Sequence, residues 1–240
     1  MVISNRTLIC VSLSILGLAV GVECHAQGLP PDEEVRGLLE ERVSLGRNPG
    51  IVVGLIDPDG VRVVMAGTSG REGVSLNGNT AFEIGSITKV FTATLLQDMV
   101  RRGEVDLQDP VGSFLPDEVE VPSEPGRSIT LLDLATHRSG LPRMPFNFAP
   151  ANVENPYADY SVEELYAFLS AASLRHPIGT EWEYSNVGMG LLGHALSRRA
   201  GMNYEALVRL RILEPLGMEN TGVDLAPALD SLLAQGHGVD

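Results

Sequence analysis

Residues 50–66 carry the pattern that most restricts what this chain can fold into. Two runs rich in β-branched residues, Gly50–Ile56 and Val61–Ala66, flank the tetrapeptide Asp57-Pro58-Asp59-Gly60. Asp, Pro and Gly favour tight turns, because Pro presets φ, Asp hydrogen-bonds its own backbone and Gly accepts a positive φ. The pattern therefore predicts an antiparallel β-hairpin.

Helical periodicity predicts two helices around this hairpin. Asp32–Leu45 follows Pro30-Pro31, begins with acidic residues and carries apolar residues at helical spacing. After a short predicted strand at Thr80–Ile84, a long helix begins near Gly85-Ser86 and ends near Gly103. The apolar stripe that marks it as a core helix consists of Val90, Phe91, Thr94, Leu95 and Met99.

The second half of the chain also reads as mostly helical. Thr130–Asp133 and Ser161–Glu164 both have the spacing of a capping box and each precedes an apolar helical pattern. The other expected segments are irregular chain at 140–142 and 145–156, an extended piece at 180–184, and helices at 187–199 and 204–213. These segments predict an α/β (α+β) fold in which an antiparallel sheet with flanking helices joins an all-helical subdomain.

Composition excludes several classes of function. The net charge of -14 disfavours nucleic-acid binding and adhesion to an anionic membrane. No His-Glu-x-x-His or similar spacing indicates a metal site, and the absence of Gly-x-Ser-x-Gly disfavours a Ser-His-Asp esterase. We expect no metal and no cofactor, and we interpret His137 and His194 as packed or capping residues.

The first 26 residues are expected to be a signal peptide. Arg6 precedes a short apolar run, Leu8–Val22, and Cys24-His25-Ala26 has small residues at both positions read by signal peptidase. We expect cleavage after Ala26 and export to the periplasm or the medium. An uncleaved anchor is the alternative, although the run is shorter than the roughly 20 residues that a membrane span needs. Glu23 disfavours a lipoprotein, and cleavage would remove both cysteines.

Lys89 is the only lysine among 17 basic residues. A guanidinium keeps its proton, whereas a partly desolvated ammonium can release one and act as a base. Ser86 lies three residues earlier, on the same face of the expected helix and at the positive end of its dipole. The pair predicts a nucleophile with its base. From this pair alone, a helix-capping serine beside a solvated lysine is the alternative.

A second polar group, Tyr184-Ser185-Asn186, lies between the extended piece and a Gly-rich helix start. A phenol beside a cationic amine is stabilised as phenolate and can relay protons, and an Asn amide can orient a lysine or bind a substrate carbonyl. For this motif taken alone, the alternative interpretation is a packed tyrosine beside an asparagine that caps a helix. Together with Ser86 and Lys89, the group is a much more specific signal than either motif alone.

With these motifs the chain resembles the serine β-lactamase and penicillin-binding protein family, in particular its class C branch, which includes D-alanyl-D-alanine carboxypeptidases, D-aminopeptidases and lipolytic esterases. The resemblance runs from about Val35 to His237 and is carried by Phe82–Phe91, Gly103–Val111, Ile129–Pro142, Pro177–Asn186 and Leu213–Met218. It implies that Ser86 is the acylated nucleophile, Lys89 its activating base, Tyr184 the general base or proton relay, and Asn186 the residue that positions substrate and lysine.

The resemblance implies a β-lactamase/transpeptidase-like fold and hydrolysis through an acyl-enzyme. The substrate class stays open between a β-lactam, a D-Ala-D-Ala-type peptide and an ester. The alternative is an inactive relic or a binding module that retains the pocket. We expect the binding partner to be a small-molecule or peptide substrate. We expect no nucleic-acid partner, and no stable insertion into a membrane after the signal peptide is cleaved. The sequence leaves the oligomeric state open.

The expected organisation is a signal peptide at 1–26 and one hydrolase domain at 27–240. Its sheet part covers about 27–84, its helical part about 85–202, and residues 203–240 begin the return to the sheet. The family also carries a Lys- or His-led Gly motif that supplies half of the oxyanion hole, and His237-Gly238-Val239 is the nearest string. We therefore expect a truncated sequence with an incomplete sheet, an open hairpin edge and turnover reduced by roughly 10²–10³.

Overall fold

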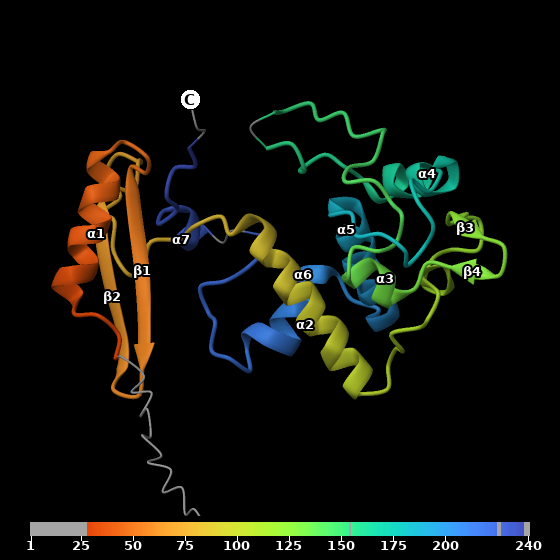
Figure 1. Cartoon of the computed structure of the whole chain (residues 1–240), viewed down its shortest axis with the longest axis horizontal. Helices are drawn as coiled ribbons and strands as arrows, with labels where there is room; N and C mark the ends of the chain where they lie inside the picture. Colours follow the sequence, from red (N-terminus) through yellow and green to blue (C-terminus); the bar gives the residue numbers. More distant parts are fainter. Residues whose placement is uncertain (1–27, 154, 225–226, 238–240) are drawn as a thin grey trace, which may run out of the picture.

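The computed structural model describes residues 28–153, 155–224 and 227–237, so the predicted signal peptide lies outside the described residues. Helix α1 (Asp32–Ser44) and strands β1 (Gly50–Asp57) and β2 (Gly60–Gly67) form a small layer at one end of the molecule, and a larger helical part forms the other end (Figure 1). Helix α2 (Thr88–Arg101) runs diagonally between them (Figure 1). Within the described residues, no helix is long and apolar enough to span a bilayer.

The predicted hairpin is confirmed. Strand β1 (Gly50–Asp57) pairs antiparallel with β2 (Gly60–Gly67), in continuous register from Gly50↔Gly67 to Asp57↔Gly60. The Asp57 carboxylate accepts a hydrogen bond from the Asp59 backbone N–H (3.0 Å), and Gly60 has a φ of 134°. The turn residues therefore act as their chemistry predicts. The part of the chain that the structure describes adds no third strand to this sheet.

Helix α1 (Asp32–Ser44) covers one face of the hairpin, as Figure 1 shows. Apolar side chains of the helix and of β2 form a small core of their own, made of Val35, Leu39, Val64 and Ala66. Near the turn, Ile56 and Val61 are 76% and 69% exposed. The small layer is thus packed on one side and open towards the tip of the hairpin.

The long helix predicted after the hairpin is confirmed as α2 (Thr88–Arg101), which follows the 3₁₀ turn η1 (Gly85–Ile87). Its predicted apolar stripe was wrong in part, because Val90 and Thr94 face solvent. The side chains that α2 buries are Thr92, Leu95, Leu96 and Met99. The difference arises because α2 packs against α5 (Asn186–Ala200), α6 (Tyr204–Val208) and the turn η3 (Arg209–Leu213). These elements cover the side of α2 that carries Thr92, Leu95 and Met99.

The predicted strand at Thr80–Ile84 is absent, and this prediction was wrong. Only Ala81 forms an isolated parallel bridge, to Leu233. Its N–H donates to Leu232 O and its carbonyl accepts from Ala234 N, both at 2.9 Å. A strand needs a hydrogen-bonded partner along several residues. Here the segment around Leu233 pairs with the chain only at Ala81.

Helix α5 (Asn186–Ala200) forms the centre of the larger part (Figure 1). Nine of its residues are buried, among them Leu191, Leu192 and Leu196. The other elements of the larger part are η2 (Val111–Phe114), β3 (Ser123–Glu124), β4 (Arg127–Ser128), α3 (Leu131–Ala135), α4 (Val162–Ala171), α6 (Tyr204–Val208) and the π-helical turn η3 (Arg209–Leu213). The short helix α7 (Pro227–Asp230) lies between the hairpin and α2 (Figure 1). The helices predicted at 187–199 and 204–213 are confirmed, the second ending in the π-helical turn.

Both predicted capping boxes are present. Thr130 accepts a hydrogen bond from Asp133 N at the start of α3, and Ser161 accepts one from Glu164 N at the start of α4. The acidic side chain of each box reaches back to the backbone N–H of its cap residue. These reciprocal bonds satisfy N–H groups that a helix start leaves unpaired.

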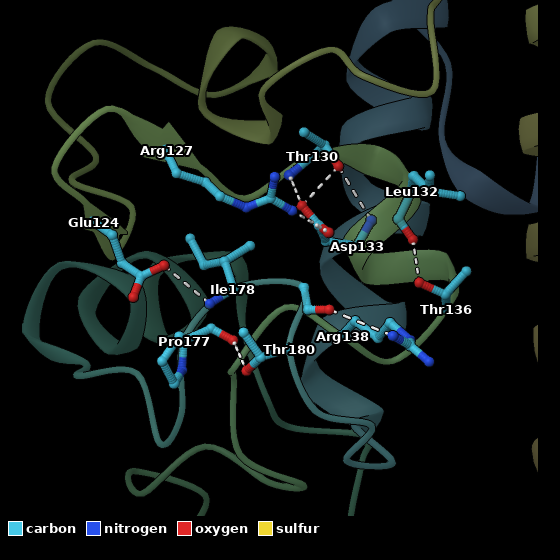
Figure 2. A network of polar contacts seen from close by, with 11 residues as sticks. Glu124, Arg127, Thr130, Leu132, Asp133, Thr136, Arg138, Pro177, Ile178 and Thr180 are labelled. Carbon is cyan, nitrogen blue, oxygen red and sulfur yellow. Dashed lines mark hydrogen bonds and ion pairs between the residues drawn. The ribbon is translucent and has the colours of Figure 1, made fainter.

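A network of polar contacts extends from the first capping box to residues 177–180 (Figure 2). Arg127 donates to the nearly buried Asp133 carboxylate at 3.0 Å. On the other side of the network, the Glu124 carboxylate accepts from Ile178 N (3.0 Å), and Arg138 donates to Gly179 O (3.4 Å). This network holds the chain that leads towards Tyr184.

Candidate active site

Ser86 lies in the turn η1 at the entrance to α2, with an exposed side chain. Gly85 has a φ of 50°, in the left-handed region that favours glycine, and this lets the chain turn sharply into the helix. The Lys89 Nζ donates a hydrogen bond to Ser86 Oγ at 3.2 Å. The prediction that the two side chains share a face is confirmed, although Ser86 sits in a 3₁₀ turn rather than in the α-helix itself.

Tyr184 reaches Ser86 from the chain just before α5. Its hydroxyl donates to Ser86 Oγ at 2.7 Å, across 98 residues of sequence. The Lys89 Nζ lies 4.8 Å from the centre of the Tyr184 ring, and the Arg143 guanidinium carbon lies 5.0 Å from it. Because a serine oxygen has two lone pairs, Ser86 accepts from both Lys89 and Tyr184.

Two cations act on the Tyr184 phenol. Hydrogen bonding to Lys89, and then to Ser86, lowers the pKa of this phenol below its usual 10.0, and the positive charges of Lys89 and Arg143 add to the effect. A lowered pKa makes the phenolate easier to form near neutral pH. Tyr184 therefore has the electrostatic surroundings of a proton acceptor.

Asn186 is the first residue of α5, and the cap is Ser185 rather than Asn186. The Ser185 Oγ accepts from Gly188 N at 2.9 Å. The Asn186 N–H donates to Arg143 O (2.9 Å), and its side-chain amide donates to Met144 Sδ (3.4 Å). Asn186 and Lys89 line the same pocket. Of the four predicted residues, three form one hydrogen-bonded group and Asn186 stands in the adjoining wall.

His137 supports Tyr184 in a way that the sequence did not reveal. Its backbone carbonyl accepts from Glu183 N (2.9 Å), and its Nδ1 accepts from Ser185 N (3.1 Å). Burial, and then the charge of Lys89, lowers the pKa of His137 below 6.5, which favours the neutral ring that this acceptor needs. No local signal predicts this role, because the partners lie about 48 residues away.

His194 is packed, as expected from the sequence. Its Nε2 and the hydroxyl of Tyr166 are 2.7 Å apart, which ties α5 to α4. Burial, and then the nearby Arg198, lowers the pKa of His194 below 6.5. Among the described residues, no three His, Cys, Asp or Glu side chains are placed to hold a metal ion.

Two pockets adjoin the site. The larger, of about 800 Å³, begins at Lys89 and Asn186 and runs between α2, α5 and the chain at 201–204. The smaller, of about 260 Å³, adjoins the larger along one face of α5, and its lining includes Met144, Phe148 and other apolar residues. Asn186 borders both pockets.

Known sequences resemble this chain over much of its length. A family model for β-lactamase matches residues 35–239. The D-alanyl-D-alanine-carboxypeptidase/endopeptidase AmpH of Escherichia coli strain K12 is 35% identical over 150 residues, which is 62% of this chain and 38% of that protein. A β-lactamase of Lysobacter lactamgenus is 29% identical over 207 residues, 86% of this chain and 51% of the relative.

Solved structures resemble the fold as well. A β-lactamase/D-alanine carboxypeptidase from Yersinia pestis, complexed with citrate, matches with a TM-score of 0.76 and 29% identity, over 85% of this chain and 58% of that one. A class C β-lactamase from Rhodobacter sphaeroides matches with a TM-score of 0.69 and 30% identity, over 84% and 54%. The chain thus spans about half the length of these relatives. The family match and the shared β-lactamase/transpeptidase fold show that this chain belongs to the β-lactamase family.

Proposed function

We propose that the chain is a serine hydrolase that acts through an acyl-enzyme on Ser86. The observation that carries the proposal is the meeting of three groups: Ser86 Oγ lies 3.2 Å from Lys89 Nζ and 2.7 Å from the Tyr184 hydroxyl. A nucleophile within hydrogen-bond reach of two proton-accepting groups is the arrangement that acyl transfer needs.

In the first half of the reaction, Ser86 Oγ bonds to the carbonyl carbon of the substrate. Its proton passes to the Lys89–Tyr184 pair, in which one of the two groups lacks its proton before the reaction. The tetrahedral intermediate then collapses, the bond to the leaving nitrogen or oxygen breaks, and Tyr184 returns a proton to the leaving group. The Ser86 backbone N–H lies in the 3₁₀ turn η1 that leads into α2, where N–H groups lack helical acceptors, and it serves as one donor to the carbonyl oxygen.

In the second half, water replaces the leaving group. Tyr184 takes a proton from the water as its oxygen bonds to the acyl carbon, the Oγ–acyl bond breaks, and Ser86 Oγ regains a proton from Lys89. Asn186 holds the substrate amide or carbonyl at the wall of the pocket. Relatives named as a carboxypeptidase/endopeptidase and as a β-lactamase support D-Ala-D-Ala-type peptides and β-lactams as substrates, and simple esters suit the same chemistry.

We also propose that the protein is exported, with a signal peptide at 1–26 and a hydrolase domain from residue 27 onwards. Expression with the native N-terminus in a bacterial host tests this. N-terminal sequencing of the periplasmic or secreted protein should begin at Gln27. Retention of the full-length chain in the membrane fraction would favour the uncleaved anchor.

Active-site labelling tests the acyl-enzyme directly. The wild-type chain should be labelled covalently by a fluorescent penicillin or a fluorophosphonate, and should hydrolyse a chromogenic cephalosporin or p-nitrophenyl acetate. Ser86→Ala should remove both labelling and hydrolysis. Ser44→Ala is the matched control, because Ser44 is an exposed serine whose hydroxyl bonds only the Glu41 carbonyl of its own helix. A folded wild-type chain that binds penicillin without covalent labelling would instead favour a non-catalytic binding module.

A further inference from the structure

Helix α5 has three glycines in its interior, and two of them have a packing reason. A glycine inside a helix costs about 1 kcal/mol relative to alanine, so its presence calls for an explanation. A Cβ at Gly188 would lie 3.0 Å from the capping Ser185 Oγ, and a Cβ at Gly193 would lie 3.2 Å from the Tyr204 ring. A Cβ at Gly190 would meet no atom within 4 Å. Packing therefore explains Gly188 and Gly193 but leaves Gly190 unexplained.

Gly190 faces the space beside the proposed acylation site. It borders both the pocket of about 800 Å³ and the pocket of about 260 Å³. Asn186 and His194 also border both pockets, and the three residues follow one another at four-residue spacing on one face of the helix. Lys89 lines the larger pocket, so the open space begins at the amine that contacts Ser86. We call the larger pocket, from Lys89 over Gly190, the Gly190 groove.

The polar groups in the wall of the Gly190 groove are largely occupied within the protein. Met189 and Met202 contribute apolar surface. The internal pairs are Thr92 Oγ1 with the Tyr204 hydroxyl (2.7 Å), the Ser197 hydroxyl with Gly193 O (2.8 Å), Asn203 Oδ1 with Ala206 N (2.7 Å), His194 with Tyr166 (2.7 Å) and Arg198 Nε with Phe114 O (2.7 Å). A ligand in the groove therefore meets mainly carbon and already paired polar groups, which favours an apolar ligand.

We propose that the Gly190 groove is an acyl-chain subsite, which binds an unbranched apolar acyl group of medium length while its carbonyl carbon is at Ser86. This inference rests on the proposed function, since that function brings the acyl group to Ser86. The missing side chain at Gly190 keeps the groove open. Each methylene buried there strengthens binding by up to roughly fourfold, because burial of one methylene is worth ~0.8 kcal/mol.

A chain-length series of esters tests the subsite during turnover. For wild type, kcat/KM for p-nitrophenyl octanoate should exceed that for the acetate by at least tenfold. Gly190→Ala should reduce this ratio and Gly190→Leu should bring it near one, because the larger side chain projects into the groove and blocks the path of the acyl chain past residue 190. Gly37→Leu is the matched control, since Gly37 is also a helical glycine whose Cβ would meet no atom within 4 Å. An octanoate-to-acetate ratio that Gly190→Leu leaves unchanged would overturn the subsite.

Equilibrium binding separates the subsite from the chemistry. In Ser86→Ala protein, calorimetry should show N-octanoylglycinamide binding at least tenfold more tightly than N-acetylglycinamide. Adding Gly190→Leu should abolish the difference, and thermal melting checks that the double variant is folded. Equal affinity for the two amides, or a difference that persists in Gly190→Leu, would refute the subsite. The two proposals can also fail separately. If octanoyl-selective binding depends on Gly190 but the wild-type chain has no esterase activity, the subsite stands and only the proposed function is refuted.

Discussion

The imidazole of His137 lies against the ring of Tyr184, with centroids 4.7 Å apart and planes tilted by 37°. The residues on both sides of Tyr184 also donate backbone hydrogen bonds to His137, Glu183 N to its carbonyl and Ser185 N to its Nδ1. His137 itself has a φ of 57°, which non-glycine residues rarely adopt. His137, two residues beyond α3, therefore contacts the Tyr184 ring and bonds both neighbours of Tyr184 in the chain.

We predict that His137→Ala lowers kcat/KM at least tenfold. The substitution removes the acceptor for Ser185 N and the ring beneath Tyr184, so the phenol moves relative to Ser86. His137→Asn should retain more activity, because Asn tolerates positive φ and offers an acceptor oxygen. Steady-state kinetics of both variants, with thermal melting to verify folding, checks this. Equal activity of the Ala and Asn variants would argue against a positioning role.

The lowered pKa of Tyr184 predicts the direction of the pH dependence. If the phenolate accepts the proton, kcat/KM should rise with pH and level off below pH 10, because the hydrogen bonds and charge of Lys89 favour the ionised phenol. Tyr184→Phe should abolish this alkaline inflection and lower the rate by roughly 10²–10⁴. The measurement is a pH–rate profile between pH 6 and 11. An inflection that persists unchanged in Tyr184→Phe would assign it to another group.

Lys89→Arg is expected to lower the acylation rate by roughly 10²–10⁴. The arginine keeps the positive charge next to Tyr184 but retains its proton, so it cannot serve as a base. Stopped-flow labelling with a fluorescent penicillin measures acylation separately from hydrolysis. Arg36→Lys, on the surface of α1, provides a charge-conserving control. Acylation at the wild-type rate in Lys89→Arg would leave Lys89 only an electrostatic role.

Acid should destabilise the folded chain through His137 and His194, which are both partly buried. Burial lowers the pKa of both His137 and His194 below 6.5, so below about pH 6.5 the unfolded chain binds these protons more readily than the folded one. The free energy of unfolding should therefore fall between pH 7 and pH 5. In urea denaturation at both pH values, His194→Gln should lose less stability than wild type. An identical loss in both proteins would contradict this origin.

Asp133→Ala should destabilise the helical part by about 1–3 kcal/mol. The substitution leaves Thr130 N without its capping acceptor and Arg127 without its partner, in a site where the Asp133 side chain is 8% exposed (Figure 2). Urea denaturation followed by circular dichroism measures the loss. Glu118→Ala removes an exposed carboxylate and should change stability by less than about 0.5 kcal/mol. A similar small change for Asp133→Ala would show that the network in Figure 2 contributes little.

Local chemistry predicted much of the fold and part of the site. The hairpin followed from its turn residues, the starts of α3 and α4 from their capping boxes, and the Ser86–Lys89 contact from three-residue spacing. The failures at Thr80–Ile84 and on α2 share one cause. Whether a segment becomes a strand, and which side of a helix is buried, depends on neighbours that are distant in sequence.

Residues close together in the chain specify the elements whose interactions lie within a few residues, and they include the kinds of side chain that can carry out acyl transfer. Tertiary structure alone decided that Tyr184 lies 2.7 Å from Ser86, that His137 and Arg143 surround its ring, and that Gly190 faces open space. Those relationships depend on how α2 and α5 pack against each other. Such packing reflects shape and burial summed over the whole core, which no local pattern encodes.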